Sequence, residues 1–518
     1  MNNTNTYATN KAWQQYEAGK EYKRRIGLYE TVRQNERFYR GDQWYGVDSA
    51  GLPKPVFNVV KRVTDYLTSS ITPSKVSVRY LDEGIPYCHD ERDAQRRARL
   101  SKVLSANANY RWERAGMDAK IFKLVKDAAI SGDGVLYCYW KHDEAGDGLY
   151  EGDICTDIID NVNLFVSDVN KSDIQSQDYV ILSGRASVLS LKREARENGV
   201  SEDDIAKIVA DLTDSRERAA DASAIELEGD DEAKATYLIK FWKEDGVVCF
   251  EKSTRGCIIN RAKTHCKLYP VAYFNWNSTK SSFHGTSAVS SLIANQKYIN
   301  RSYAMVMKHM SDTAFSKVIY DKSKIPEWSN EVGEAIGAVG TTNVSDAVAV
   351  LGVGKLQDEY LEFLDNVISV TKELGGATDT ALGNVTPVNT SAILAIQEAS
   401  KIPLSVIRSS LYQCIEELAS IWADMLISYC PPERLLPVSC TDGELLAECV
   451  GNMCGAHLRT KIEITDTSAY NASLTISILD KLLDGGHITA GQYMELLPKK
   501  YVPNFKDILE GGEESAGK

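Results

Sequence analysis

Apolar and polar positions recur at two different periods along this chain, and the two periods predict its elements. Apolar side chains return every three or four residues over 11–40, 58–70 and 90–130, as in amphipathic helices. Gly41 ends the first of these segments and Gly116 interrupts the third. Because glycine lets the backbone leave the helical conformation easily, we expect separate helices on either side of Gly116.

Shorter segments alternate apolar and polar residues or are rich in β-branched and aromatic residues, which predicts strands. They cover residues 76–80, 135–140, 150–159, 164–166, 179–182, 236–242, 247–251, 271–274 and 459–466. Residues 200–235 differ because they are acidic and contain few apolar residues. There we expect a short helix followed by a mobile surface linker.

Three long helical patterns follow Gly285, over residues 286–317, 356–374 and 391–429. A mixed segment separates the first two patterns, and a loop separates the last two. Pro403 lies inside the third pattern, where we expect a kink, because proline removes a backbone hydrogen bond and clashes with the preceding turn. Short helices over 471–484 and 489–497, before a disordered tail, are expected to complete an α+β protein.

The composition is that of a soluble folded protein with an acidic balance. The 518 residues are 43% hydrophobic and 25% charged, and the net charge is -13. Proteins that bind DNA tightly usually carry excess lysine and arginine, because their affinity comes from displacing counterions at the phosphates. The acidic balance therefore argues against a tight DNA binder, and is compatible with DNA that slides past without sticking.

Cysteine usage and hydropathy predict a protein that resides or assembles inside a cell. The 11 cysteines are scattered and odd in number, unlike a disulfide framework. Residues 1–10 lack the apolar stretch of a signal peptide. No apolar run reaches the roughly 18 residues that a membrane-spanning helix needs. We expect no membrane association.

Patterns that would indicate catalysis are incomplete. Leu351-Gly-Val-Gly-Lys355 is similar to a phosphate-binding loop, but Ala349 and Leu356 occupy positions where that motif needs Gly and Ser or Thr. Cysteines and a histidine in the last quarter of the chain lack the CxxC spacing of zinc sites, namely Cys440, Cys449, Cys454 and His457. The seven histidines, among them His284, form no paired or nucleophile motif. We expect a non-enzyme without metal or cofactor.

Three parts of the sequence resemble the portal proteins of tailed bacteriophages. The first is NERFYRGDQW at 35–44 with PVFNVV at 55–60, and the second is PVAYFN at 270–275 with LIANQKYIN at 292–300. The third is ILDKLLDGGHITAGQ at 478–492. The order of the predicted elements is also similar to that family, so the resemblance covers most of the chain.

The resemblance implies the phage portal fold, with a mixed α/β wing, a helical stem, a small α/β clip, a long kinked helix and an α-helical crown. Residues 1–280 would form the N-terminal part of the wing. The other implied parts are stem helices at 281–318 and 356–376, a clip at 319–355, a tunnel loop at 377–389, the kinked helix and return to the wing at 390–466, and the crown and tail at 467–518.

Two segments are implied as contact sites. The tunnel loop would touch DNA weakly and reversibly, because it carries one acid and no lysine or arginine, through Thr378, Asp379, Thr380, Asn384, Val385 and Thr386. A plain connection between two helices is the alternative. The clip would dock the packaging motor and later the adaptor through Lys322, Lys324, Pro326 and Trp328. Trp328 would be either an exposed docking anchor or part of the clip core.

The function implied by the resemblance is a ring-shaped channel, with twelve subunits in this family, for packaging and ejecting double-stranded viral DNA. The implied partners are other copies of the chain, the terminase large subunit, the major capsid or scaffolding protein and a head–tail adaptor. The protein would be part of the virion, at the capsid vertex, and of the host cytoplasm during assembly. The alternatives are another virion protein, either capsid or adaptor, and a terminase-type ATPase.

Overall fold

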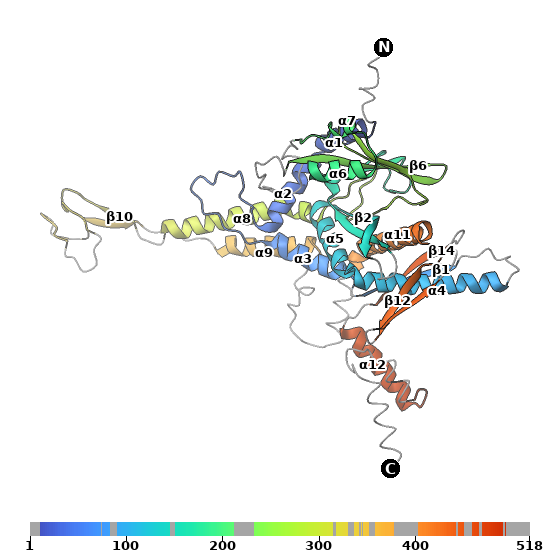
Figure 1. The fold of residues 1–518 in the computed structure, drawn as a ribbon. Coiled ribbons are helices and arrows are strands. Elements are labelled where there is room, and N and C mark those ends of the chain that lie inside the picture. The colour runs from blue at the N-terminus through green and yellow to red at the C-terminus, as the bar shows by residue number, and fades with distance from the viewer. Residues whose placement is uncertain are drawn as a thin grey trace.

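The computed structural model describes residues 11–73, 75–82, 91–145, 151–211, 233–313, 317–329, 336–340, 343, 345, 347–351, 358–377, 402–431, 433–441, 444–449, 458–465, 469–489 and 493. They form a body of helices and small sheets from which a helical arm extends (Figure 1). The α+β class expected from the sequence is confirmed.

The described α-helices divide between the body, the arm and the C-terminal region (Figure 1). They are α1 (Lys11–Arg25), α2 (Leu28–Arg40), α3 (Val59–Ile71), α4 (Glu91–Arg114), α5 (Met117–Ser131), α6 (Val188–Glu197), α7 (Glu202–Ile205), α8 (Ala288–Thr313), α9 (Asp358–Leu374), α11 (Ser405–Tyr429) and α12 (Ala469–Asp484). Two short 3-10 helices are η1 (Asn161–Asn163) and η5 (Ile402–Leu404).

The strands form small antiparallel sheets. A five-stranded sheet contains β4 (Leu164–Val166), β5 (Tyr179–Ser187), β6 (Lys234–Glu244), β7 (Val247–Ser253) and β8 (Ile258–Lys263), in that order. A three-stranded sheet has the order β3 (Glu151–Ile159), β2 (Asp133–Ala145) and β9 (Val271–Asn275). The pairs are β1 (Lys75–Asp82) with β14 (Leu458–Thr465), β10 (Lys317–Tyr320) with β11 (Val348–Leu351), and β12 (Leu435–Thr441) with β13 (Glu444–Cys449).

The single helix predicted over 11–40 was wrong, because the structure has two helices there. α1 ends at Arg25 and α2 begins at Leu28. Gly27 between them has a φ of +69°, in the left-handed region that favours glycine. The apolar spacing continues across this break, since Leu28 and Tyr29 are buried, so periodicity alone did not reveal it.

Four helices and strands of the body were not predicted, because their apolar patterns are weak. In β8 only Ile259 is buried, and α6 buries only Leu191 and Ala195. The hairpin of β12 and β13 contains Pro437, and its register shifts between that residue and Ser439. Proline interrupts the alternation from which strands are read.

The largest apolar core surrounds α11. Its buried face includes Leu411, Ile415 and Trp422. The Trp422 ring lies 6.1 Å from that of Trp112 on α4, and its Nε1 donates to Thr156 on β3 at 3.1 Å. This long helix therefore joins the three-stranded sheet to α4.

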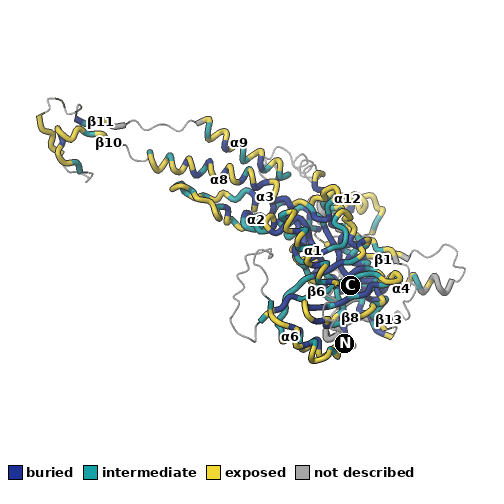
Figure 2. Tube along the Cα trace, turned by 90° about the horizontal axis from the view of Figure 1, so that it is seen from above, coloured by how far each residue is buried: buried dark blue, intermediate teal, exposed yellow. Residues whose placement is uncertain are grey.

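The arm consists of α8 and α9, which pack side by side, with the β10–β11 hairpin beyond their ends (Figure 1). The start of α8 is anchored in the body, where Val289 and Leu292 are buried. Towards the hairpin most side chains become exposed (Figure 2). Among the described helices, none is both long and apolar enough to cross a membrane.

Candidate functional site

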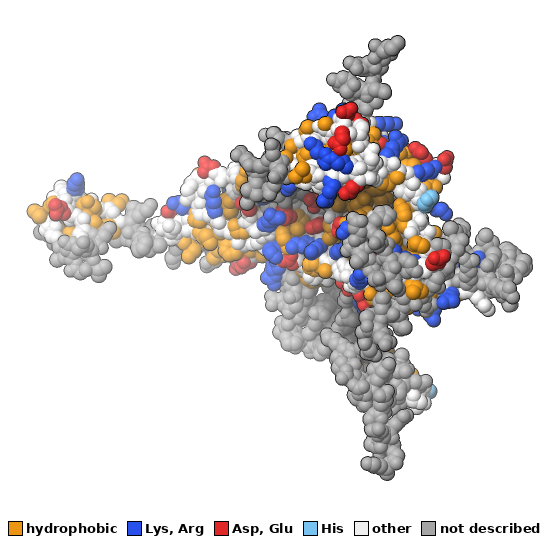
Figure 3. All heavy atoms as spheres, in the orientation of Figure 1, with side chains coloured by type: hydrophobic (Ala, Val, Ile, Leu, Met, Phe, Trp, Pro, Cys, Tyr) orange, Lys and Arg blue, Asp and Glu red, His pale blue; other side chains and the backbone are white. Residues whose placement is uncertain are grey.

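Several large apolar side chains of the arm are exposed in the single chain. On α9, Phe363, Val370 and Leu374 are 52%, 42% and 73% exposed. Their spacing of seven and four residues places them on one face of the helix. Tyr298 of α8 adjoins this face, because its ring centroid lies 6.4 Å from that of Phe363. Figure 3 shows hydrophobic side chains gathered along the arm.

A second exposed apolar surface lies on the segment between α2 and α3, which we call the 43–57 segment. It contains Tyr45, Val47, Val56 and Phe57, all more than a third exposed. This segment and α9 lie on opposite sides of α8 (Figure 1). A contiguous group of exposed apolar residues often marks a surface that binds a partner. The arm therefore offers two candidate interaction surfaces.

Buried amides hold the 43–57 segment against α8. Gln296 donates from Nε2 to the Phe57 carbonyl at 2.8 Å and accepts from the Val59 amide at 3.0 Å. Asn300 donates to Oε1 of Gln43 at 2.6 Å. Because both helix amides are almost fully buried, these bonds fix the position of the segment.

The two arm helices carry opposite charge. α8 contains three basic residues and one acidic residue, whereas α9 contains five acidic residues and one basic residue. Arg301 and Lys308 on α8 are exposed, as are Glu359, Glu362 and Glu373 on α9. The two helices of the arm therefore carry net charges of opposite sign. This difference would favour contact between a face formed by α8 and a face formed by α9.

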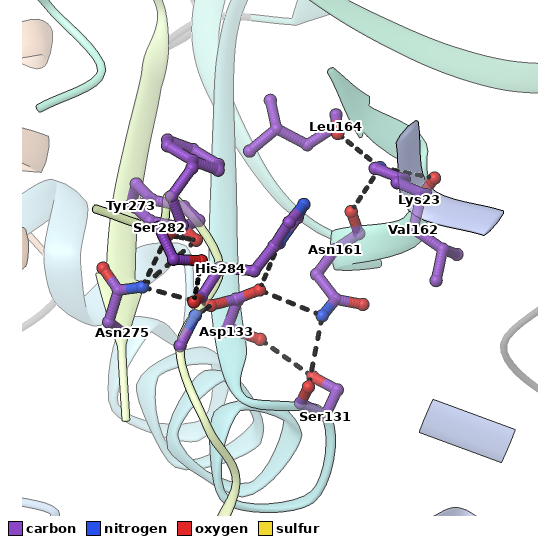
Figure 4. Close-up of polar contacts among 12 residues, drawn as sticks. Lys23, Ser131, Asp133, Asn161, Val162, Leu164, Tyr273, Asn275, Ser282 and His284 are labelled. Atoms are coloured by element: carbon purple, nitrogen blue, oxygen red, sulfur yellow. Dashed lines mark hydrogen bonds and ion pairs between the residues drawn. The ribbon is translucent and has the colours of Figure 1, made fainter. Parts of the chain in front are cut away.

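The root of the arm is fixed by a buried polar network around Asp133, the first residue of β2 (Figure 4). Its fully buried carboxylate accepts from His284 Nδ1 at 2.7 Å and from the Gly285 amide at 2.7 Å. It also accepts from the side-chain amides of Asn161 at 3.1 Å and Asn275 at 3.2 Å. The carboxylate thus connects β2 to β9 and to the segment that leads into α8.

Close backbone packing accompanies this network. A Cβ on Gly132 would lie 2.5 Å from the Gly285 carbonyl oxygen, and Gly132 also has a φ of +102°. Asn35 on α2 donates to the Ile130 carbonyl at 2.8 Å and to Ser287 Oγ at 2.9 Å. The start of α8 is therefore joined to both α2 and α5.

Lys23 of α1 ends in the same region. Its Nζ donates to the carbonyls of Asn161, Val162 and Leu164 at 3.0, 2.9 and 2.5 Å. Burial lowers the pKa of this lysine well below its ordinary value, and the negative charge of Asp133 acts in the opposite direction. Because its Nζ bonds to three carbonyls of one segment, Lys23 is a structural tie between α1 and the segment formed by η1 and the start of β4.

Nothing in the sequence gives a reason to connect Asp133 with His284. The two partners are 151 residues apart, so no local spacing signals the pair. His284 is 7% exposed and its ring packs edge-on against Phe283. This environment assigns it to packing rather than to a solvent-accessible base.

The residues expected to dock partners lie at the far end of the arm, next to the β10–β11 hairpin. Lys322 and Pro326 are exposed, and Lys324 is half-buried. Trp328 is also half-buried and its ring stacks on Tyr320, with centroids 5.2 Å apart. One face of the Trp328 ring therefore stabilises the hairpin, while part of the side chain stays exposed. Trp328 thus has features of both sequence-based alternatives, the exposed docking anchor and the residue of the clip core.

The predicted tunnel-loop residues lie outside the described part of the chain, and so do residues 391–401 of the long helical pattern. The tunnel-loop set is Thr378, Asp379, Thr380, Asn384, Val385 and Thr386. Pro403 is described and forms part of η5, immediately before α11. The kink at Pro403 stays a prediction.

Comparisons with known proteins give no family assignment. No protein-family model matches the chain, and no curated protein matches it. Among solved structures, the chain is similar to one from a structure described as the neck of an empty GTA particle computed with C6 symmetry. That alignment covers 90% of this chain and 94% of the other, with 11% identity and a TM-score of 0.34. A similarity of this degree identifies no family.

Proposed function

We propose that this chain is a portal-type subunit, which assembles into a closed ring at a capsid vertex and forms the channel for packaging and ejecting double-stranded viral DNA. The observation that carries the proposal is the arm with its two unlike apolar surfaces. Under this proposal α8 and α9 are stem helices, the β10–β11 hairpin belongs to the clip, and residues 377–389 are the tunnel loop.

The two surfaces support a ring because they differ from each other. When one face of a subunit binds a different face of the next copy, the contact repeats head to tail, and it closes into a ring if the rotation fits. The apolar face of α9 would pack against the 43–57 segment of the neighbour. Basic α8 and acidic α9 would then add charge complementarity between copies.

The proposed ring acts sterically rather than catalytically. The net charge of -13 favours a conduit past which DNA slides, because the excess of acidic side chains weakens the overall attraction for phosphates. At the tip of the arm, Lys322, Pro326 and Trp328 are placed to meet a packaging motor, and later a head–tail adaptor. The fold class and the arm support this function over that of a capsid shell subunit.

End-on electron microscopy of the purified full-length protein tests the proposal. We expect closed rings with a central hole and near-twelvefold symmetry. Closed shells without a channel would indicate a capsid subunit instead. Steady ATP hydrolysis by the purified protein, absent from a mock preparation, would indicate a terminase-type enzyme and contradict the proposed role.

Replacing Asp379 and Asn384 together by lysine is expected to slow or arrest DNA packaging without preventing ring assembly. Lysines in the tunnel loop would hold the moving phosphates, whereas the natural loop has no basic residue. The measurement is the packaging rate in a reconstituted reaction. The matched control places the same charge change on the exposed surface of the body, as Asn198→Lys with Asp203→Lys. Equal rates for the loop variant and the control would contradict the tunnel-loop assignment.

A further inference from the structure

A groove of about 710 Å³ lies between the start of α1 and one face of the five-stranded sheet. Residues from α1 and from four strands line it, among them Lys11, Tyr179, Lys240, Trp242, Glu251 and Arg261. Its volume is in the range of about 300–1,000 Å³ that binding clefts commonly have. The groove is separate from the arm surfaces and from the Asp133 network.

Helix α1 covers only one part of this sheet face. Tyr16 of α1 and Leu238 of β6 belong to one buried apolar cluster. Because side chains alternate between the two faces of a strand, Lys240 and Trp242 continue on the face on which Leu238 lies. Lys11 is the first residue of α1 and lines the groove. The cover that α1 provides therefore ends at the groove.

Beyond α1 the face carries a row of side chains that crosses β5, β6, β7 and β8. In the register of the sheet Trp242 pairs with Tyr179, and Glu251 pairs with both Lys240 and Arg261. The Lys240 ammonium lies 5.4 Å from the ring centroid of Tyr179 and 5.5 Å from that of Trp242. The Arg261 guanidinium lies 5.3 Å from the Trp242 ring. Cations and aromatic rings thus alternate along the row.

Part of the row is accessible in the described structure. Arg261 and Ile258 on β8 are exposed, and the side chains of Tyr179 and Trp242 are half-buried. Tyrosine, tryptophan and arginine are enriched at the centres of binding surfaces. The row therefore has the composition of a surface that another segment of protein would cover.

The charge of the groove is balanced. Three cationic and three acidic side chains line it, namely Lys11, Lys240, Arg261, Asp178, Glu244 and Glu251. A nucleic acid would need an excess of cations to hold its phosphates, and a highly charged peptide would meet like charges. An uncharged segment rich in amides and hydroxyls suits this lining, because those groups both donate and accept hydrogen bonds.

A segment of this kind is joined directly to the groove. Residues 1–10, MNNTNTYATN, contain no charged side chain, and seven of the ten are Asn or Thr. They lie outside the described part of the chain, and they precede Lys11 at the groove wall. Ten residues span up to about 33 Å, whereas four strands at about 4.8 Å spacing measure about 15 Å across. A segment tethered this closely has an effective concentration of the order of millimolar.

We propose that residues 1–10 dock into this groove of the same chain, with the ring of Tyr7 beside Trp242 and the cations of Lys240 and Arg261. The asparagine and threonine side chains would bond to the carboxylates of the lining. Docking would cover the part of the sheet face that α1 leaves accessible. This contact does not depend on the proposed ring, so either can fail without the other.

Photo-crosslinking of the full chain tests the docking. Tyr7→p-benzoylphenylalanine keeps an aromatic ring at this position and forms covalent bonds to its neighbours under ultraviolet light. Mass spectrometry of the digested protein is expected to place the crosslinks on β6 and β8. A mixture of chains with ordinary and heavy nitrogen separates crosslinks within one chain from those between two chains, and we expect them within one chain.

The matched comparison combines this reporter with Arg261→Ala or with Arg193→Ala, an exposed arginine of α6 that does not line the groove. We expect the groove crosslinks to fall at least about threefold in Arg261→Ala, as for the loss of one exposed cation–aromatic contact, and to persist in Arg193→Ala. Equal yields in the two variants would mean that the tether alone brings the segment near, which overturns the site. Absent or scattered crosslinks would overturn it as well. Crosslinks between two chains would assign the groove to a neighbouring copy and contradict docking in the same chain.

Discussion

Replacing Asp133 by alanine is expected to lower the free energy of unfolding by about 3–5 kcal/mol, because each buried donor that loses its acceptor costs about 1–3 kcal/mol. The substitution leaves His284 Nδ1 and the Gly285 amide without an acceptor in the interior. Asn161 and Asn275 each lose one hydrogen bond and keep the bonds to the Ser131 and Phe283 carbonyls. Each stranded donor keeps its desolvation cost without a bond to offset it. Urea unfolding of the full chain, followed by circular dichroism, measures the change.

The control for this substitution is Asp157→Ala on β3. Asp157 is exposed and accepts a hydrogen bond from Tyr139 at 3.0 Å. Its removal is expected to cost about 0.5 kcal/mol or less, as for most surface positions. Hydrogen exchange should also become faster at the start of α8 in Asp133→Ala. If both variants unfold at the same urea concentration as the wild type, the network does not hold the arm root.

Replacing Val370 and Leu374 together by aspartate is expected to abolish ring assembly at micromolar concentration. Both side chains are exposed on α9 in the single chain, so the subunit itself should fold normally. In the proposed ring they become buried, and each lost apolar contact costs about 1.5–3 kcal/mol. The added negative charges also enlarge the acidic excess of α9. Together the changes should weaken association by at least about a hundredfold.

The matched control introduces two aspartates at exposed apolar positions away from the arm, Leu189 and Val209. Analytical ultracentrifugation of the three proteins gives the comparison. Rings of normal stability in the arm variant would remove the arm from the interface. Equal loss in the control would indicate that assembly responds to total charge rather than to this surface.

Local signals predicted much of the fold. Gly116 separates α4 from α5, and Gly376 with a φ of +73° follows α9. The helical pattern expected from residue 58 corresponds to α3, which Asn58 caps by accepting from the Lys61 amide. These residues act on neighbours within a few positions, so the sequence alone is enough to interpret them. The α8–α9 pair was likewise indicated by two apolar stripes on either side of a mixed segment.

The candidate sites could not be predicted from the sequence alone, because they depend on contacts between segments that are distant in the chain. The Asp133 network joins residues on β2, β9 and η1 that only the tertiary fold brings together. A recess lined by Glu36, Asp127 and Asp160 likewise combines α2, α5 and the end of β3. Each acid looks like an ordinary surface residue in the sequence, and only its neighbours in space give it a distinct environment.

The attachment of α8 to the body at one end has a mechanical consequence. With 26 residues, α8 is about 39 Å long at about 1.5 Å per residue, and buried contacts hold it to the body as far as Asn300. The part of α8 beyond Asn300 extends for about 20 Å. A tilt of about 5° at Asn300 moves the far end of the helix by about 2 Å, a value that follows from that length. Small rearrangements in the contacts of Gln296 and Asn300 are therefore amplified at the hairpin.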